Sequence, residues 1–368
     1  MTHASSEILV IGAGVIGLSA ALRLRQAGLR VTVLERGSVG REASWAGGGI
    51  LSPLHPWRYR PALLQLATAG MQQYPNFVAE IQAATGIDPE WLASGMWVLN
   101  SPEAPLPADA PAWGADWGWQ WQQFSAAEMR ARAPFLHADS ALFCPEVAQV
   151  RNPRLLAGLR AYVEQLGVAI HEHQEVEALA RQSHVWKVST HSAVWESERV
   201  LLSAGPWSKT ILERQGISTS ITPVRGQMAL LQGEPGALPQ IVLEGSHYLV
   251  QRKDGQILVG STSEDVGFCK GNTEEALAEL RAFAERVFPA ARAADLLQQW
   301  SGLRPGSPDN IPYIGAVPEH PGLYLAAGHF RYGLTTAPIT AELLRALILE
   351  QEPPLDPTPY RLPLSPKA

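Results

Sequence analysis

Residues 7–36, EILVIGAGVIGLSAALRLRQAGLRVTVLER, decide the fold of this chain. The apolar run from Ile8 to Ile11 suits a parallel strand that is buried on both faces. A glycine-rich turn follows, then a stretch with helical periodicity up to Gln26, and Gly28 stands where a helix C-cap is expected. The chain returns at residues 31–35 as a second apolar strand. These residues predict a complete strand–turn–helix–strand unit.

The turn of this unit has the spacing of a dinucleotide-binding site. Gly12 permits the tight turn, Gly14 lets a pyrophosphate approach the backbone, and Gly17 lets the helix pack closely on the strand. Glu35 follows Gly17 by eighteen residues and is placed to bind ribose hydroxyls. The helix dipole favours a phosphate at its first residues. The unit indicates an ADP-containing ligand, which could be NAD or FAD. The alternative is an ordinary unit of this kind that binds no ligand. The predicted binding residues of the turn are Gly12, Gly14, Val15, Ile16 and Gly17.

Composition narrows the class of protein. At 368 residues the chain exceeds the usual size of one hydrophobic core, so two domains are expected. A net charge of −6 offers no basic surface for nucleic acid. Cys144 and Cys269 are too few for a disulfide framework or a cysteine-rich metal site, so no metal is expected. Both cysteines are predicted to be buried apolar residues.

The sequence shows no targeting or membrane-spanning pattern. Residues 1–7 lack a basic region ahead of the first apolar run. Eighteen apolar residues in succession occur nowhere. We therefore expect a cytoplasmic protein without stable membrane insertion.

Residues 37–56, GSVGREASWAGGGILSPLHP, contain too much glycine for a regular element. The three glycines at 47–49 would let the backbone lie flat against a planar ligand. Loops of this length are more often functional than idle. A flexible surface loop is the alternative, which the apolar residues that begin at Ile50 disfavour.

These stretches together resemble a known family. GAGVIG at 12–17, LER at 34–36 and REASWAGGGIL at 41–51 are similar to the amino-terminal region of the FAD-dependent amine and D-amino-acid oxidases, most closely the glycine oxidase branch. The resemblance implies FAD as cofactor, with Glu35 on the ribose and the second stretch beside the flavin. It adds to the cofactor site Arg36, Ser44, Ala46, Gly47, Gly48 and Ile50.

Three helices are expected in the next part of the chain. The first covers residues 60–85, and Pro75 should kink or split it. The second runs from a capping box at Ser125 to Arg132. The third starts with Asn152 as N-cap.

A tryptophan-rich segment, which contains Trp113, Trp117, Trp119 and Trp121, lies between the first two helices. An aromatic cage for a substrate is one interpretation. Packing in the core or a contact between subunits is favoured over it.

Residues 168–208 favour FAD over NAD. A buried strand at 168–170 precedes strands at 176–180, 185–190 and 194–198, and residues 199–203 lead into an Ala-Gly turn. An NAD dehydrogenase would more often continue with alternating strands and helices. By the resemblance, the cofactor also contacts Val176, Ala204, Gly205 and Trp207.

Antiparallel strands are expected within residues 222–262, followed by a helix over 273–287. The predicted fold is α/β, with a Rossmann-like FAD-binding domain of the glutathione-reductase type and an interleaved α+β substrate domain built on an antiparallel sheet. The FAD-binding domain comprises 1–85, 147–222 and 302–358. The substrate-binding domain comprises 86–146 and 223–301, and 359–368 form a C-terminal tail.

Arg304 carries the sharpest chemical signal. It follows an apolar strand in the context Gly-Leu-Arg-Pro, and a planar guanidinium suits the binding of a carboxylate in one orientation. A surface arginine is the alternative. By the resemblance, Arg304 binds the substrate carboxylate and the Tyr248 hydroxyl contacts the same group. Without the family, Tyr248 could equally be a half-buried strand tyrosine.

Residues 323–338 predict a buried strand, a glycine-rich turn and a helix whose positive end faces the flavin. This segment resembles the family's second flavin motif, in which Arg331 lies on the substrate side. His329 could be a base, but packing or a hydrogen bond to the cofactor is favoured. The cofactor residues assigned here are Gly328, His329, Arg331, Tyr332, Gly333, Leu334 and Thr335.

The predicted function is that of an enzyme. The resemblance implies oxidation of glycine, sarcosine and small D-amino acids by non-covalent FAD and molecular oxygen, with hydride transfer from Cα, and a role in the thiazole branch of thiamine synthesis. A homo-oligomer is expected. The alternatives are a D-amino-acid dehydrogenase that reduces a quinone and a non-catalytic protein of the same fold.

Overall fold

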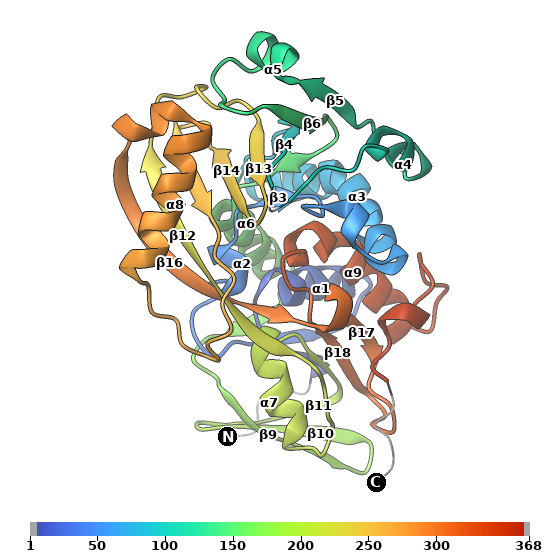
Figure 1. The fold of residues 1–368 in the computed structure, drawn as a ribbon. Helices are drawn as coiled ribbons and strands as arrows, with labels where there is room; N and C mark the ends of the chain where they lie inside the picture. The colour runs from blue at the N-terminus through green and yellow to red at the C-terminus, as the bar shows by residue number, and fades with distance from the viewer. Residues whose placement is uncertain (1–5, 103, 364–368) are drawn as a thin grey trace.

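The computed structural model describes residues 6–102 and 104–363, and contains two large sheets with helices packed around them (Figure 1). Residues 1–5 and the end of the predicted C-terminal tail, 364–368, lie outside the described residues. The described helices are α1 Val15–Gln26, α2 Ala43–Ala46, α3 Pro61–Thr85, α4 Ala110–Asp116, α5 Ala126–Arg132, α6 Asn152–Gln165, α7 Ser208–Glu213, α8 Glu274–Val287 and α9 Gly333–Ile348.

The first sheet is mainly parallel. Its strands are β1 Ser6–Ile11, β2 Val31–Leu34, β8 Ala169–His171, β9 Val176–Gln182, β10 Val185–Thr190, β11 Val194–Leu202, β17 Tyr313–Ala316 and β18 Leu323–Ala327. They lie in the order β17-β18-β11-β1-β2-β8, with β10 and β9 continuing from β11. β1 pairs in parallel with both β2 and β11. The predicted strand–turn–helix–strand unit therefore occupies the centre of this sheet.

The second sheet is antiparallel except for one pair. Its strands are β4 Met96–Leu99, β5 Gln122–Ser125, β6 Ser140–Cys144, β12 Thr222–Gln232, β13 Ile241–Glu244, β14 His247–Gln251, β15 Gln256–Gly260 and β16 Asp295–Gly306. The order is β16-β12-β15-β14-β13-β4-β6-β5, and only β13 and β4 are parallel within it. A separate short pair joins β3 Ile50–Leu51 to β7 Ala148–Gln149. The predicted α/β fold with a second, antiparallel sheet is confirmed.

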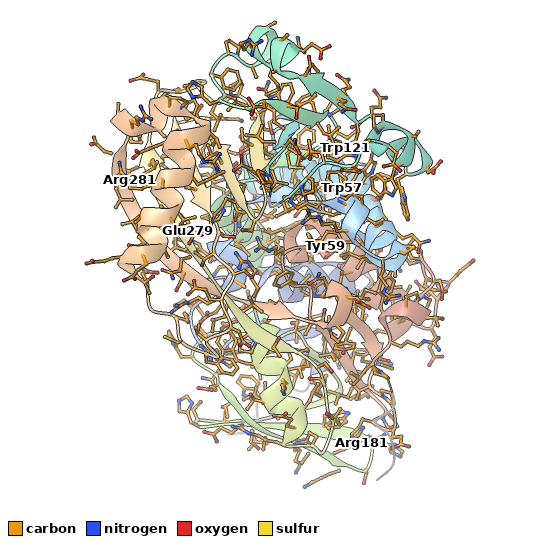
Figure 2. All side chains as sticks on the ribbon, in the orientation of Figure 1. Trp57, Tyr59, Trp121, Arg181, Glu279 and Arg281 are labelled. Carbon is orange, nitrogen blue, oxygen red and sulfur yellow. The ribbon has the colours of Figure 1, made fainter. Side chains whose placement is uncertain are left out.

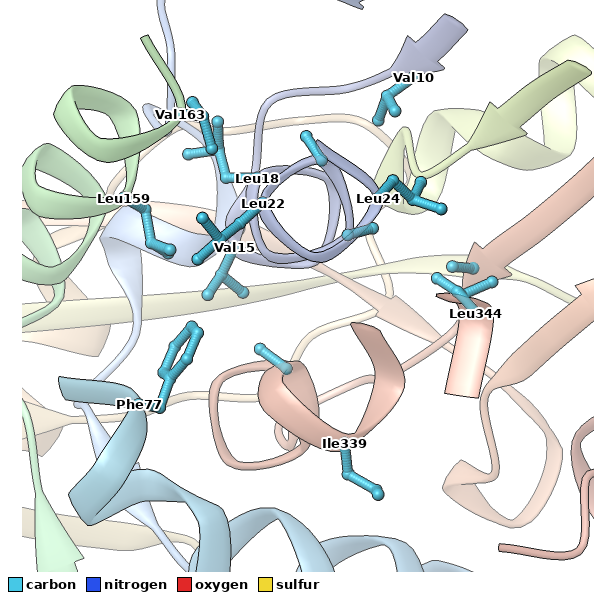
Figure 3. Close-up of a cluster of buried hydrophobic side chains, with 14 of the residues drawn as sticks. Val10, Val15, Leu18, Leu22, Leu24, Phe77, Leu159, Val163, Ile339 and Leu344 are labelled. Carbon is cyan, nitrogen blue, oxygen red and sulfur yellow. The ribbon is translucent and has the colours of Figure 1, made fainter. Parts of the chain in front are cut away.

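Helix α1 is the centre of the main core (Figure 3). Its side chains Val15, Leu18 and Leu22 are almost completely buried. Phe77 of α3, Leu159 of α6 and Ile339 of α9 lie around it. Burying apolar area from four helices at once stabilises the glycine turn that precedes α1.

The second core lies under α8, which covers one face of the second sheet on the left of Figure 1. Thr273 caps this helix by accepting the Ala276 N–H at 3.2 Å, and Leu280, Phe283 and Val287 face the sheet. Strands β12 and β16 pair over their whole length, which places Val224 opposite Arg304. This pairing carries residues of the second sheet towards the ends of the first.

Several local predictions differ from the structure. Pro75, expected to kink or split the first helix, lies inside one continuous helix, α3, so it does not split it. The 37–56 stretch is not wholly irregular, because it contains α2 and β3. The strand predicted at 168–170 is an edge strand with exposed and half-buried residues, since it pairs only with β2.

Three further predictions need correction. The strand predicted at 194–198 does not end there, because residues 199–202 continue it as part of β11. Asn152 is the first residue of α6 and not its N-cap, because its side chain bonds elsewhere. Cys144 is buried as predicted, whereas Cys269 is exposed.

Candidate active site

A cavity opens at the carboxyl ends of β1, β2, β11 and β18. Its empty space is about 1560 Å³, counted with the solvent at its mouth. Its wall includes the glycine turn, Glu35 and part of the 44–50 stretch, which are the parts predicted to hold a dinucleotide. Ligands of open α/β sheets bind at the carboxyl ends of the strands. The sheet therefore places the cavity where a dinucleotide site is expected.

The glycine turn forms one wall of this cavity. Gly12 has a φ of 104°, and a Cβ there would lie 2.5 Å from the Ser203 carbonyl oxygen. A Cβ on Gly17 would lie 1.9 Å from the Gly12 carbonyl oxygen. Both positions require glycine, because β11 and α1 approach the turn so closely. Gly17 acts through this packing, since it is not among the residues that line the cavity.

Glu35 directly follows β2 and lines the cavity. Its carboxylate accepts the Ala13 N–H at 2.8 Å and the Gly37 N–H at 2.9 Å. These bonds join the acid to the glycine turn, so the side chain is buried and held in place. A carboxylate also has lone pairs left to accept ribose hydroxyls. The residue fits the ribose role that its spacing predicts.

An aromatic and cationic stack lies at the far end of the cavity. The Arg36 guanidinium lies 3.7 Å from the centroid of the Trp207 ring, and Trp207 also contacts Phe268. Arg36 pairs with Glu42 at 3.3 Å. Val176 lines the same end. Ring stacking of this kind suits a flat base.

Arg304 also lies in the wall of the cavity. Its guanidinium donates to the Ser261 hydroxyl oxygen at 2.6 Å and to the Thr262 carbonyl oxygen at 3.1 Å. A Cβ on Gly226 would lie 2.2 Å from either Nη atom of Arg304, so the guanidinium rests directly on this glycine. Burial and the neighbouring positive charge of Arg331 lower the pKa of Arg304 to about 9.

Arg331 adds a second positive charge beside the first. It donates to the same Ser261 oxygen at 3.2 Å. Neither Arg304 nor Arg331 forms an ion pair with any carboxylate in the described part of the chain. Two cations that lack an anion partner, on the wall of an apolar cavity, form a site suited to an anionic ligand.

Tyr248 lies between this anion site and the glycine-rich stretch. Its hydroxyl donates to the Met228 sulfur at 3.3 Å, and its side chain is buried. A Cβ on Gly48 would lie 2.5 Å from the Tyr248 ring, and one on Gly260 would lie 2.6 Å from it. The two glycines leave the space that the ring fills. Tyr248 therefore connects the predicted substrate and cofactor ends.

His329 is buried in the wall of the cavity. Its Nε2 lies 3.3 Å from the Thr340 Oγ1. Burial lowers its pKa to about 3, so the imidazole is neutral at physiological pH. This supports packing and hydrogen bonding over a role as a protonated group.

The tryptophan-rich segment packs beside the site without lining it. Trp57 contacts Trp121 with a centroid distance of 5.5 Å (Figure 2). Trp119 and Trp121 are buried in a core cluster. The interpretation as core packing is confirmed for these two side chains, and none of the four tryptophans lines the cavity.

The cavity brings most predicted site residues together and leaves five out. Those in its wall are Gly12, Gly14, Val15, Ile16, Glu35, Arg36, Ser44, Gly47, Gly48, Ile50, Val176, Ala204, Gly205, Trp207, Tyr248, Arg304, His329, Arg331, Gly333 and Leu334. Those behind the wall are Gly17, Ala46, Gly328, Tyr332 and Thr335.

The four other residues behind the wall have visible partners. The Ala46 carbonyl accepts the Trp300 indole N–H, and the Gly328 carbonyl accepts the Ser307 hydroxyl. Tyr332 donates its hydroxyl to that of Tyr59. The Thr335 hydroxyl donates to the Ile50 carbonyl. These contacts hold the wall in place from outside the cavity.

Sequence reasoning missed several residues that shape the site. Gly226 had a signal, because glycine inside a strand often marks a close approach. Ser261 and Thr262 had none, since only the fold brings them to Arg304. Among the described residues, no cluster of side chains suited to a metal is found, and no helix is long and apolar enough to span a membrane.

Comparison with known proteins identifies the family. Residues 7–347 match the family described as FAD dependent oxidoreductase. The chain is 42% identical to "Glycine oxidase" of Pseudomonas aeruginosa, over 97% of this chain and 98% of that protein. It is 34% identical to "Bifunctional protein ThiO/ThiG" of Synechocystis sp., over 95% of this chain and 52% of that protein.

Comparison with solved structures supports the same family. The crystal structure of glycine oxidase from Geobacillus kaustophilus superposes with a TM-score of 0.94 at 27% identity, covering 99% of this chain and 100% of that one. The glycine turn, the held Glu35 and the residues that line the cavity fit a dinucleotide cofactor. The chain therefore belongs to the FAD dependent oxidoreductase family, and its cofactor is FAD.

Proposed function

We propose that this chain is an amino-acid oxidase that oxidises glycine, sarcosine and small D-amino acids with molecular oxygen. One observation supports this above the others: Arg304 and Arg331 meet at one end of the FAD cavity without a carboxylate partner among the described residues. A substrate carboxylate would complete this pair. The similarity to glycine oxidases supports glycine as the first substrate to test.

The roles of the substrate residues follow from the contacts. Arg304 would bind the carboxylate with its planar fork, and Tyr248 would add a hydroxyl donor from the adjacent wall. Arg331 would contribute positive charge from the other side of Ser261. Together these residues would orient a small amino acid, with its Cα towards the flavin end of the cavity.

The roles of the cofactor residues follow in the same way. The glycine turn and the start of α1 would hold the pyrophosphate, because α1 has no acidic residue in its first turn. Glu35 would bind the ribose. The 44–50 stretch and the start of α9 would surround the flavin, since Gly47, Gly48, Gly333 and Leu334 line the cavity.

The chemistry requires no acid–base pair from the protein. When bound, FAD would supply the acceptor for the hydride, with its two electrons, that leaves the substrate Cα, with oxygen as the final oxidant. His329, whose pKa lies at about 3, is neutral and has no proton to give. For glycine, the overall reaction consumes oxygen and water and yields glyoxylate, ammonia and hydrogen peroxide.

FAD is proposed to be non-covalently bound. Neither cysteine of the chain lines the cavity, and Pro305 and Gly306 stand where the related sarcosine oxidases carry the cysteine that bonds flavin. Acid precipitation of the purified protein should release the yellow colour into the supernatant. A precipitate that stays yellow would contradict this assignment.

One experiment tests the proposed function. The visible spectrum of the purified protein is recorded, and peroxide is then followed with glycine, sarcosine, D-alanine and D-proline. We expect a flavin spectrum and peroxide in proportion to oxygen uptake. Reduction of a quinone-like dye without oxygen uptake would instead indicate a dehydrogenase, and a protein without bound flavin would indicate a non-catalytic relative.

The biological role and assembly are part of the same proposal. We propose that the product serves the thiazole branch of thiamine synthesis, which the name of the ThiO/ThiG relative suggests. Deletion of the coding sequence should then create a need for added thiazole. We also propose a homo-oligomer, which light scattering on the purified protein would measure.

A further inference from the structure

The carbonyl groups of Ser44, Ala46, Gly47 and Gly48 accept hydrogen bonds from side chains that do not line the cavity. The carbonyl oxygens of Ser44 and Gly47 accept the two N–H groups of Asn152, at 3.0 and 2.8 Å. The carbonyl oxygen of Ala46 accepts the Trp300 indole N–H at 3.0 Å. Side chains outside the cavity wall therefore hold several backbone carbonyls of this stretch by hydrogen bonds.

Arg252 completes this set of contacts. Its guanidinium donates to the Gly48 carbonyl oxygen at 2.9 Å and to the Gln149 side-chain oxygen at 2.7 Å. The side chain is only 5% exposed and has no ion pair within the described residues. Burying a cation without an anion partner costs free energy, so we expect the Arg252 hydrogen bonds to have a structural role. Its visible contacts are with Gly48 and with the strand that pairs with β3.

The three donors come from separate parts of the fold. Asn152 begins α6, Trp300 lies on β16, and Arg252 follows β14. None of the three lines the cavity, whereas Ser44, Gly47 and Gly48 do. The donors therefore act on the wall of the cavity from behind it.

The opposite face of this stretch is free to bind. Within the described residues, the backbone N–H groups of Gly47 and Gly48 have no hydrogen-bond acceptor. A peptide whose carbonyl is fixed on one side presents its N–H on the other side, because the peptide unit is planar. Unpaired N–H groups at a cofactor site are suited to the acceptor atoms of the cofactor.

We infer that Asn152, Arg252 and Trp300 are positioning residues, which hold four carbonyls of the 44–48 stretch away from the cavity so that N–H groups of this stretch face FAD. They act through the backbone and touch neither substrate nor cofactor. The inference depends on FAD binding in this cavity and not on which amino acid is oxidised. An absence of peroxide formation with glycine would therefore not contradict this inference.

Trp300→Phe is the sharpest test, because it removes the indole N–H and keeps an aromatic ring. Trp186→Phe is its matched control, since the buried Trp186 indole N–H also donates to a backbone carbonyl, that of Pro321 at 3.0 Å, away from the cavity. FAD is titrated into the apoprotein of each variant. Spectra of the flavin-saturated proteins and thermal midpoints are then recorded.

We expect Trp300→Phe to raise the FAD dissociation constant by about 3- to 10-fold, the range for one lost hydrogen bond. The visible flavin bands should shift, because the hydrogen bonding of the flavin changes. Trp186→Phe should leave affinity and bands unchanged, even if its thermal midpoint falls. Equal dissociation constants and unshifted bands for Trp300→Phe would overturn the role of Trp300.

Arg252→Lys gives a second measurement that keeps the positive charge but loses the planar fork. Its control is Arg151→Lys, which alters a half-buried, hydrogen-bonded arginine outside the cavity wall. Weaker FAD binding in Arg252→Lys alone would support the inference, also if Trp300→Phe fails to fold. Wild-type affinity and spectra in both Trp300→Phe and Arg252→Lys would reject it.

Discussion

The Arg304 guanidinium donates to the Ser261 hydroxyl oxygen at 2.6 Å. The same oxygen accepts a second N–H from Arg331, so one serine joins the two cations of the anion site. Ser261 is fully buried and lies behind the cavity wall. This arrangement fixes the direction of the Arg304 fork before any ligand arrives.

Ser261→Ala should weaken substrate binding without removing FAD. A hydrogen bond to a charged group contributes about 1.5–3 kcal/mol, so we expect the KM for glycine to rise by roughly tenfold or more. The measurement is steady-state oxygen uptake, with FAD content from the visible spectrum. Ser197→Ala is the control, because Ser197 is a buried serine that donates to the Ser6 carbonyl far from the site. An unchanged KM in Ser261→Ala would contradict the role.

Arg304→Ala should abolish carboxylate anchoring while FAD stays bound. Loss of a buried charge-assisted contact costs about 2–5 kcal/mol, which predicts a rise in KM of about 30-fold or more. The same oxygen assay and a carboxylate inhibitor titration would measure it. Arg181→Ala, which changes an exposed arginine of β9 that does not line the cavity (Figure 2), serves as the control. Unchanged affinity for glycine would remove Arg304 from the substrate site.

Gly226→Ala should mimic the loss of Arg304 without unfolding the protein. The added Cβ would meet the end of the Arg304 side chain at 2.2 Å, and this flexible end can move whereas backbone cannot. We therefore expect a KM rise of about tenfold or more from the displaced fork, with little change in thermal midpoint. Wild-type kinetics would show that the guanidinium does not need this position.

His329 should make the protein sensitive to acid. Burial lowers its pKa from 6.5 to about 3, so between these values the unfolded chain binds a proton that the folded chain does not. The free energy of unfolding should fall as the pH falls from about 6.5 towards about 3, and His329→Gln should reduce this slope by about one proton. Denaturation of the FAD-saturated proteins at several pH values measures it. Exposed His191, changed to Gln, is the control, and equal slopes for His329→Gln and wild type would contradict the prediction.

Local sequence patterns were sufficient to predict those elements whose conformation depends on neighbouring residues. The close approach of the Ser203 carbonyl to Gly12, and of the Gly12 carbonyl to Gly17, explains why a glycine spacing alone predicts the turn. The hairpin of β14 and β15 and the cap of α8 at Thr273 also depend on neighbouring residues. Pro75 shows the limit, because burial of α3 against the core stabilises a helix that its local sequence would interrupt.

The sequence by itself determined the strand–turn–helix–strand unit, the acid at Glu35 and the chemical type of Arg304, because each depends on residue type and short spacing. The tertiary structure alone decided what surrounds them. Ser261 reaches Arg304 across 43 positions of the chain, and Arg252 reaches Gly48 across 204. Contacts over such separations arise from sheet pairing and core packing, which leave no periodic signal in the sequence.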